Sequence, residues 1–182
     1  MIRLLDFFAA FVGLFFLWPV LLIVTIIGLL DTGSPIFVQV RVGRNKKPFK
    51  LIKFRTMKVE TKSVASHLAK NASITRLGVF LRKTKIDELP QLINVVKGEM
   101  SLVGPRPNLF NQEELIKVRD EKGVYDVLPG ITGLAQVQNI DMSTPELLAK
   151  TDKQMIDTLT LKDYFKYILM TATGRGSGDA VK

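Results

Sequence analysis

The sequence contains no cysteine and a single histidine, His67. Without cysteine, the chain can form neither a disulfide framework nor a thiolate metal site. One histidine cannot build a histidine cluster around a metal. Because His67 lies in a polar stretch, we expect it on the solvated surface, with no part in any chemistry.

Charge is also missing from the segment between Phe7 and Leu30, which is 24 residues long. A helix needs about 20 apolar residues to span a bilayer. The segment lacks the basic start, short core and small-residue cleavage site of a removable signal peptide, so we expect it to stay in the mature protein. The pattern indicates a membrane-embedded element.

Pro19 lies near the middle of this segment, where proline kinks or breaks a helix. Two half-helices of about 12 residues would each reach about 18 Å, less than the hydrocarbon core of about 30 Å. The segment is therefore either a kinked spanning helix or a hairpin that enters and leaves one leaflet. Basic residues flank the segment on both ends: Arg3 before it, and Arg41, Arg44, Lys46 and Lys47 after it. Basic residues prefer the cytoplasmic side of a membrane, and the hairpin would place both flanks on that one side.

Basic residues outnumber acidic ones by 26 to 17, which gives a net charge of +9. A charge of this sign implies anionic partners such as membrane headgroups, nucleotide phosphates or nucleic acid. The length of 182 residues is typical of one compact domain.

Two adjacent carboxylates, Asp87 and Glu88, precede Pro90. Proline fits the first turn of a helix, so the carboxylates are expected at or just before a helix N-terminus. The apolar face of that helix is predicted to comprise Leu89, Leu92, Ile93 and Val96. Adjacent carboxylates repel each other unless a cation such as Mg²⁺ lies beside them, and one could then hold metal while its neighbour acts as nucleophile or base. Alternatively, Asp87 caps the helix and Glu88 compensates its dipole.

Arg106 stands between two prolines in the sequence Gly104-Pro105-Arg106-Pro107. Each proline fixes its own φ and restricts the preceding residue, so the Arg106 backbone is predicted to have little freedom. A guanidinium held in this way suits bidentate contact with phosphate. A rigid loop with a surface arginine is the alternative interpretation.

Two short runs, Ile36 to Val40 and Phe49 to Met57, predict a β-hairpin joined by a basic loop from Arg41 to Pro48. Lys53 and Arg55 would then share one face of the second strand. This pair could bind a diphosphate or the lipid surface, or could simply be solvated.

Further elements follow from periodicity and turn residues. We expect an amphipathic helix over 74–83, a charged helix without chemistry over 111–122, a helix from 145 to about 159 and an aromatic amphipathic piece over 161–171. The last could lie in the headgroup zone or in the core. Two glycines in the turn from Leu128 to Gly133 could let the backbone approach a ligand closely.

Five motifs resemble, in order, those of the bacterial sugar transferase family, the monotopic polyprenyl-phosphate phosphoglycosyl transferases of the small, catalytic-domain-only type. They are Lys53-Phe54-Arg55-Thr56-Met57, Leu81 to Leu92, Met100 to Pro107 and Pro129-Gly130-Ile131-Thr132-Gly133, together with the first hydrophobic segment. The resemblance extends to about Leu169.

The resemblance implies a mostly helical α+β fold with three parts. Residues 1–30 would form a re-entrant hairpin broken at Pro19. Residues 31–173 would form a transferase domain with a small β-hairpin and amphipathic interfacial helices, which folds as one unit with the anchor. Residues 174–182 would form a flexible tail. The protein would lie in the bacterial inner membrane, with the catalytic domain on the cytoplasmic face.

The implied reaction transfers a sugar 1-phosphate from a UDP-sugar to undecaprenyl phosphate and releases UMP. The resemblance implies an N-acetylated amino sugar, the commoner donor for short members of the family. Asp87 would be the nucleophile, Glu88 would help hold Mg²⁺, and Arg106, with Lys53 and Arg55, would bind phosphate. This would be the first membrane step of glycoconjugate or polysaccharide assembly.

The chain departs from the family pattern at two places. Trp18 stands where members often have serine before the proline, and Ala135-Gln136-Val137 runs into Gln138-Asn139-Ile140-Asp141 where members often have Asn-Gly-Arg. No sugar or uridine contact is therefore predicted from that segment.

A membrane-anchored basic protein that binds nucleic acid or anionic lipid without catalysis is the alternative. The basic residues lack interleaved aromatics for base stacking, so no nucleic acid is expected as a partner. Membrane lipids are expected partners in either case, and a homo-oligomer stays open.

Overall fold

The computed structural model describes residues 2–61 and 73–174, so His67 and the tail predicted for 174–182, apart from its first residue, lie outside the described residues. Over these described residues the fold is α+β and mostly helical, with two small sheets of two strands each. Described residues of Met1–Gln39 and Lys50–Gly98 form one compact unit, and those of Val40–Phe49 and Glu99–Gly178 form a second. The domain boundaries expected from the sequence stay a prediction.

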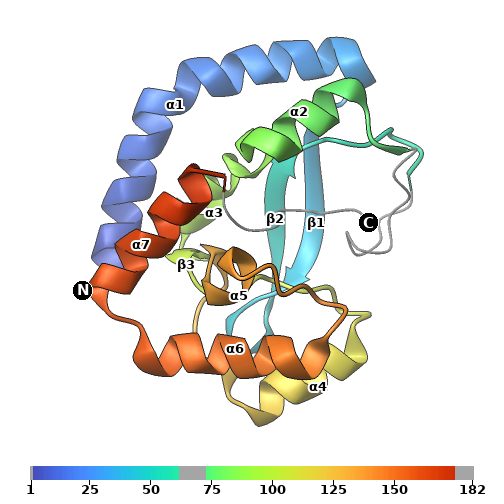
Figure 1. Ribbon diagram of the computed structural model, residues 1–182. Coiled ribbons are helices and arrows are strands. Elements are labelled where there is room, and N and C mark those ends of the chain that lie inside the picture. The colour runs from blue at the N-terminus through green and yellow to red at the C-terminus, as the bar shows by residue number, and fades with distance from the viewer. Residues whose placement is uncertain (1, 62–72, 175–182) are drawn as a thin grey trace. The chain divides into compact units, whose positions relative to one another are not determined.

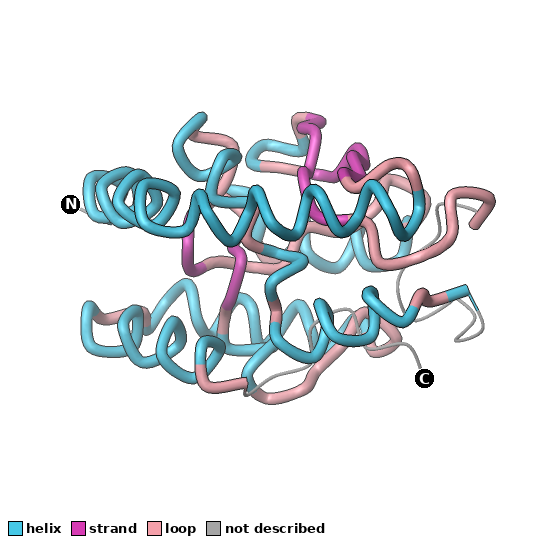
Figure 2. Tube along the Cα trace, turned by 90° about the horizontal axis from the view of Figure 1, so that it is seen from above, coloured by secondary structure: helices cyan, strands magenta, loops and turns pink. Residues whose placement is uncertain are grey.

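Helix α1 (Ile2–Thr32) is the first element of the first unit, and it contains Pro19 near its middle. Figure 1 shows the helix bending sharply, and Figure 2 shows one half end-on and the other lengthwise. The predicted interruption at Pro19 thus takes the form of a bend inside one continuous helix.

Most of the surface of α1 is apolar and exposed. Buried positions form a narrow line of four residues, Asp6, Ala10, Val24 and Gly28, whereas Phe16 is 72% exposed and Leu30 85%. By length and composition, α1 is the one helix in the described ranges that could cross a membrane. An apolar surface of this extent is typical of contact with lipid or with a partner.

The hairpin that follows is close to the predicted one. Strand β1 (Ile36–Val42) pairs with β2 (Pro48–Phe54), and the short helix η1 (Arg44–Lys46) joins them. The tip, Val40–Phe49, belongs to the second unit and the base to the first. The predicted basic loop began at Arg41, but this residue lies in β1 and is only 5% exposed, so the predicted start of the loop is wrong.

The first unit continues with α2 (Arg76–Thr84), η4 (Ile86–Glu88) and α3 (Gln91–Lys97). Thr75 caps α2 by accepting a hydrogen bond from the Gly78 backbone N–H at 2.9 Å. The buried face of α2 holds Gly78 and Leu81, while Phe80 is 55% exposed. The Thr56 backbone comes so close to α2 that a Cβ at position 78 would lie 2.0 Å from the Thr56 carbonyl oxygen, which is why glycine fits there.

In the second unit, β3 (Ser101–Val103) pairs in parallel with β4 (Gly130–Thr132), with Ser101 opposite Gly130. The helical elements of this unit are α4 (Glu113–Glu121), η5 (Val124–Asp126), α5 (Leu134–Val137), α6 (Pro145–Thr158) and α7 (Leu161–Ala172). Leu115, Ala135 and Leu148 form a core cluster between α4, α5 and α6. Proline is tolerated at the start of α6 because a first-turn N–H has no partner inside the helix.

Helix α7 has two different faces. Tyr164 and Tyr167 are buried, whereas Phe165 is 57% and Leu169 65% exposed. The aromatic segment predicted over 161–171 therefore supplies core residues on one side and an apolar surface on the other.

Candidate functional site

The two carboxylates lie in the turn η4, between α2 and α3. Lys85 ends α2 in a left-handed conformation with φ 60°, and the chain then turns through Asp87 and Glu88 to Pro90, which directly precedes α3. This is the predicted place, just before a helix that begins after proline. Asp87 is 2% exposed and Glu88 5%. Burying two adjacent acids is costly, and groups of this kind gather at functional sites.

The predicted apolar face of α3 is confirmed at Leu92 and is shifted at the positions that follow. The helix buries Leu92 and Val95, together with the polar Asn94, whereas Ile93 and Val96 are only half-buried. The Asn94 amide explains the shift, since it donates to the Lys50 carbonyl at 2.7 Å and its oxygen accepts from the Ile52 N–H at 3.1 Å. This side chain therefore bonds to β2 as a neighbouring strand would, which fixes α3 against the hairpin.

The basic pair lies at the end of β2, on one face, as predicted. The Lys53 ammonium lies 5.7 Å and the Arg55 guanidinium 5.4 Å from the centre of the Phe37 ring. Lys53 is 7% exposed. The Arg55 Nε also donates to the Ser34 carbonyl at 2.8 Å, so part of this guanidinium holds the turn that follows α1.

One hydrophobic cluster connects these features of the first unit. Val24, Phe54 and Leu81 are buried together, and Ile86 packs against them with Val20, Leu21 and Leu77. Phe54 stands between Lys53 and Arg55, and Ile86 precedes Asp87. The cluster therefore places the basic pair, the carboxylate turn and the part of α1 that follows Pro19 in one region.

Arg106 lies in the second unit, in a loop whose carbonyl groups are held one after another. The Pro105 carbonyl accepts from the Gly130 N–H at 2.9 Å, and that of Asn108 accepts from the Val42 N–H at 2.9 Å. Between them, Arg119 donates to the Arg106 carbonyl at 2.8 Å, and Arg41 donates to the Pro107 carbonyl at 3.1 Å. These donors restrain the loop in addition to its two prolines, and the rigidity expected for the Arg106 backbone stays a prediction.

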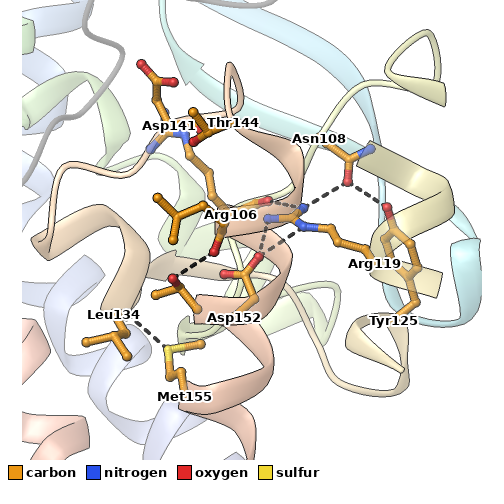
Figure 3. Close-up of polar contacts among 11 residues, drawn as sticks. Arg106, Asn108, Arg119, Tyr125, Leu134, Asp141, Thr144, Asp152 and Met155 are labelled. Atoms are coloured by element: carbon orange, nitrogen blue, oxygen red, sulfur yellow. Dashed lines mark hydrogen bonds and ion pairs between the residues drawn. The ribbon is translucent and has the colours of Figure 1, made fainter. Parts of the chain in front are cut away.

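Arg119 is the centre of a buried polar network (Figure 3). Its Nε and one terminal nitrogen donate to Asp152 Oδ2 at 3.0 and 2.6 Å, and the other terminal nitrogen donates to Asn108 Oδ1 at 3.0 Å. The Tyr125 hydroxyl donates to the same Asn108 oxygen at 2.9 Å. Burial raises the pKa of the Asp152 carboxyl, although the Arg119 charge opposes the rise, and burial also raises the pKa of Tyr125.

The half-buried Arg106 side chain points toward Asp141 and Thr144 (Figure 3). Asp141 ends the segment Gln138-Asn139-Ile140-Asp141, for which the sequence predicted no sugar or uridine contact. The arginine side chain therefore faces this segment.

The glycines of the 128–133 turn serve a different purpose from the predicted one. A Cβ on Gly130 would lie 2.0 Å from the Gly104 nitrogen, and one on Gly104 would lie 2.6 Å from the Leu128 carbonyl oxygen. The backbone that comes close is thus the chain's own Gly104 loop, whereas the sequence suggested a ligand.

Three polar residues of this region were not predicted as important. Arg41 was taken as a loop charge, and Arg119 and Asp152 lie in helices with mixed charges that gave no functional signal. In the structure Arg119 and Asp152 are each only 1% exposed. A basic residue in a charged helix has the same sequence pattern whether it is buried or solvated, so nothing in the sequence separates the two cases.

A metal at the carboxylate turn would have few protein ligands. No group of three or more His, Cys, Asp or Glu side chains that could hold a metal occurs in residues 2–61 and 73–174. Mg²⁺ is commonly held by one or two carboxylates, with waters and substrate phosphates as the other ligands. Asp87 and Glu88 fit a Mg²⁺ ion of this kind and do not fit a closed structural site.

The chain is similar in sequence to known proteins. A family model described as bacterial sugar transferase matches residues 1–175. The chain is 39% identical over 163 residues to an uncharacterized sugar transferase of Haemophilus influenzae, an alignment that covers 78% of this chain and 34% of the relative. It is 44% identical over 108 residues to a putative undecaprenyl-phosphate N-acetylgalactosaminyl 1-phosphate transferase of Bacillus subtilis, covering 58% of this chain and 60% of the relative.

A third relative is a UDP-glucose:undecaprenyl-phosphate glucose-1-phosphate transferase of Caulobacter vibrioides, which is 37% identical over 179 residues, covering 93% of this chain and 67% of the relative. The chain thus spans between a third and two thirds of the length of these relatives. The family model covers nearly all of the chain and includes both the carboxylate turn and the arginine loop. The protein therefore belongs to the bacterial sugar transferase family.

Proposed function

We propose that this protein transfers a sugar 1-phosphate from a UDP-sugar to undecaprenyl phosphate and releases UMP. The observation that carries the proposal is the turn with Asp87 and Glu88, two adjacent acids that are both more than nine-tenths buried in a chain of net charge +9. Membership of the family and the names of the relatives support the general reaction.

The transfer proceeds in two displacements at phosphorus. A carboxylate oxygen of Asp87 attacks the β-phosphorus of the UDP-sugar, the bond from that phosphorus to the bridging oxygen breaks, and UMP leaves with the bond's electron pair. An aspartyl-phosphosugar remains. An oxygen of undecaprenyl phosphate then attacks the same phosphorus, the bond to Asp87 breaks, and undecaprenyl-diphospho-sugar is formed with the carboxylate restored.

The basic residues counter the negative charge of both substrates. Arg106 binds a phosphate group through its planar fork, which matches phosphate geometry. Lys53 and Arg55, whose cationic groups lie over the Phe37 ring, provide further positive charge that attracts phosphate. Glu88 helps hold a Mg²⁺ ion, which when bound neutralises the charge that develops on the leaving phosphate. The negative charge of the substrate phosphates is thus countered by fixed positive groups in both displacements.

The acceptor lipid requires a membrane location. The exposed apolar surface of α1 lies in the bilayer, and the bend at Pro19 returns the helix to the leaflet that it entered, so that the polar part of the chain stays on the cytoplasmic face of the inner membrane. The site then lies where a soluble donor and a lipid acceptor both reach it.

The donor sugar is proposed to be an N-acetylated amino sugar. Relatives are named for N-acetylgalactosamine and for glucose, so membership of the family does not by itself select one. A panel of UDP-N-acetylgalactosamine, UDP-N-acetylglucosamine, UDP-glucose and UDP-galactose separates these possibilities.

The test is UMP release by the purified full-length protein in detergent, with Mg²⁺ and undecaprenyl phosphate. One donor of the panel should give release, and Asp87→Asn should lower the rate by at least about a thousandfold because the nucleophile is lost. Asp157→Asn, in an exposed pair with Lys153, is the matched control and should keep full activity. No release from any donor, or full activity in Asp87→Asn, would refute the proposal, and salt-sensitive nucleic-acid binding that survives the substitution would favour the non-catalytic alternative.

A further inference from the structure

We propose that Arg119 is a positioning residue, which acts on the reaction only through Arg106 by fixing the backbone of the arginine loop. The inference rests on the proposed function in one respect, namely that Arg106 contacts a substrate phosphate. It assigns a role to a buried helical residue that has no contact with substrate in the mechanism above.

The loop needs such a residue because of its composition. Pro105 and Pro107 have no backbone N–H, so the loop offers few donors of its own by which neighbouring elements could hold it. Its carbonyl groups must instead accept hydrogen bonds from donors elsewhere. Backbone N–H groups reach the carbonyls of Pro105 and Asn108, and side-chain guanidiniums reach the two in between, those of Arg106 and Pro107.

The carbonyl of Arg106 itself is held by Arg119, at 2.8 Å. The peptide group that carries this carbonyl is directly bonded to the Arg106 Cα, so its orientation sets where the Arg106 side chain starts. A phosphate contact made at the end of a long side chain is sensitive to such a shift, because a misplacement of about 1 Å can cost about a hundredfold in rate.

Arginine suits this task because one guanidinium reaches three partners in fixed directions. Arg119 donates to Asp152, to Asn108 and to the Arg106 carbonyl at once. Lysine would keep the charge, but its single ammonium on a flexible stem cannot reproduce the planar fork. Lysine at this position would therefore retain the ion pair with Asp152 and lose the defined hold on the loop.

Asp152 and Tyr125 make the orientation of Arg119 unique. Two guanidinium nitrogens converge on Asp152 Oδ2, so the plane of the fork is set from α6. Tyr125 donates to the Asn108 oxygen that Arg119 also contacts, which keeps that oxygen turned toward the guanidinium (Figure 3). The network is a chain of contacts from α6 and η5 to the loop backbone.

The test is a double-mutant cycle with Arg119→Lys, Arg106→Ala and the double variant, assayed for kcat/KM of UMP release. We expect Arg119→Lys alone to lower kcat/KM by roughly 10- to 100-fold, mainly through KM for the UDP-sugar. In the Arg106→Ala background the same substitution should have less than about a threefold effect, since the group that it positions is gone. If Arg106→Ala leaves no measurable turnover, the cycle is run on affinity for UDP with Mg²⁺.

Equal effects of Arg119→Lys in both backgrounds would overturn the proposal, because a purely structural residue lowers the folded fraction whether or not Arg106 is present. The matched control is Asp120→Asn, the next residue along α4, which breaks only an exposed pair with Lys46 at 2.7 Å and should leave kcat/KM unchanged.

A second measurement does not depend on activity. Amide hydrogen exchange at Gly130 and Val42, whose N–H groups bond to the carbonyls of Pro105 and Asn108, should be faster in Arg119→Lys than in Asp120→Asn, while exchange in α6 stays the same. Unchanged exchange at these two amides would refute the positioning role even if activity fell. A wild-type protein without UMP release would refute the proposed function instead, and the exchange result would still decide whether Arg119 holds the loop.

Discussion

At the scale of residues, the second unit contains a buried ion pair, Arg119 with Asp152, and a buried tyrosine, Tyr125. Arg119 and Tyr125 both donate a hydrogen bond to Asn108 Oδ1. The ion pair of Arg119 and Asp152 is 1% exposed on both sides, so its partners have left water completely. Buried pairs of this kind contribute little net stability, because desolvation offsets their attraction, yet removing one partner is strongly destabilising. The pair is better explained by the geometry that it imposes on the loop of Arg106.

Tyr125 gives a pH-dependent prediction at this scale. Burial raises the pKa of its hydroxyl above the ordinary value of 10.0. The folded protein keeps the proton in a range where the unfolded chain has released it, so the contribution of Tyr125 to stability is full below about pH 10 and is lost as the pH rises through the raised pKa. At neutral pH, Tyr125→Phe should lower the free energy of unfolding by about 1 kcal/mol, through loss of the bond to Asn108.

The measurement is thermal or denaturant unfolding of both proteins in detergent at several pH values. The difference in free energy of unfolding between wild type and Tyr125→Phe should shrink as the pH is raised from about 9 to about 11. A difference that stays constant over this range would show that Tyr125 does not titrate with folding.

At the scale of elements, two strands of the second unit approach each other through glycine. Gly130 in β4 lies against Gly104, which follows β3, and a Cβ on Gly130 would meet the Gly104 nitrogen at 2.0 Å. Overpacking of this kind typically costs about 1 to 3 kcal/mol. Here the backbone displaced by the added methyl group is that of the loop with Arg106, so a structural change there also reaches the candidate site.

Gly130→Ala is therefore expected to lower the free energy of unfolding by about 1 to 3 kcal/mol, and to reduce UMP release from the protein that remains folded. Gly13→Ala is the control, because the nearest atom to its new Cβ is the movable Leu92 Cδ1 at 3.3 Å and alanine favours helix. Stability and activity of Gly130→Ala equal to those of Gly13→Ala would contradict the close approach.

The bend of α1 leads to a prediction about topology. Pro19 removes one helical hydrogen bond, and Pro19→Ala restores it, so the 31-residue helix should straighten to about 46 Å, enough to cross a bilayer. Because the natural chain has no cysteine, single cysteines at Leu4 and Asp31 can report on the two ends.

With Pro19 present, an impermeant maleimide added outside spheroplasts should label neither cysteine. The same reagent added to inverted membrane vesicles should label both. With Pro19→Ala, one end should become reactive from outside. Labelling of the two ends from opposite sides in the chain that keeps Pro19 would show that α1 spans the membrane and would refute the re-entrant hairpin.

At the scale of the whole molecule, local rules predicted the features that depend on neighbouring residues. Pro90 marked the start of α3 and the place of Asp87 and Glu88, and the alternation after Pro48 indicated the hairpin with Lys53 and Arg55 on one face. Each of these depends on residues within one turn or one strand, where backbone preferences decide the outcome.

Contacts between distant parts of the chain could not be predicted in this way. Asn94 bonds to Lys50, and Arg41 bonds to Pro107, across 44 and 66 residues of sequence. Arg41 was expected in a basic loop and no contact was predicted for Asn94, but in the structure both side chains donate to backbone carbonyls of distant segments. The apolar face of α3 and the role of Arg41 were mistaken for this reason, and Arg119 was overlooked for the same reason.

In the proposed reaction, Asp87 carries the phosphosugar during transfer. The most direct measurement uses the purified protein with Mg²⁺ and the active UDP-sugar, but without undecaprenyl phosphate. We predict a burst of UMP of up to about one equivalent per protein, together with a peptide containing Asp87 that gains the mass of the phosphosugar and loses it when the lipid is added. A burst without modified Asp87, or UMP release that requires the lipid in every case, would contradict the account.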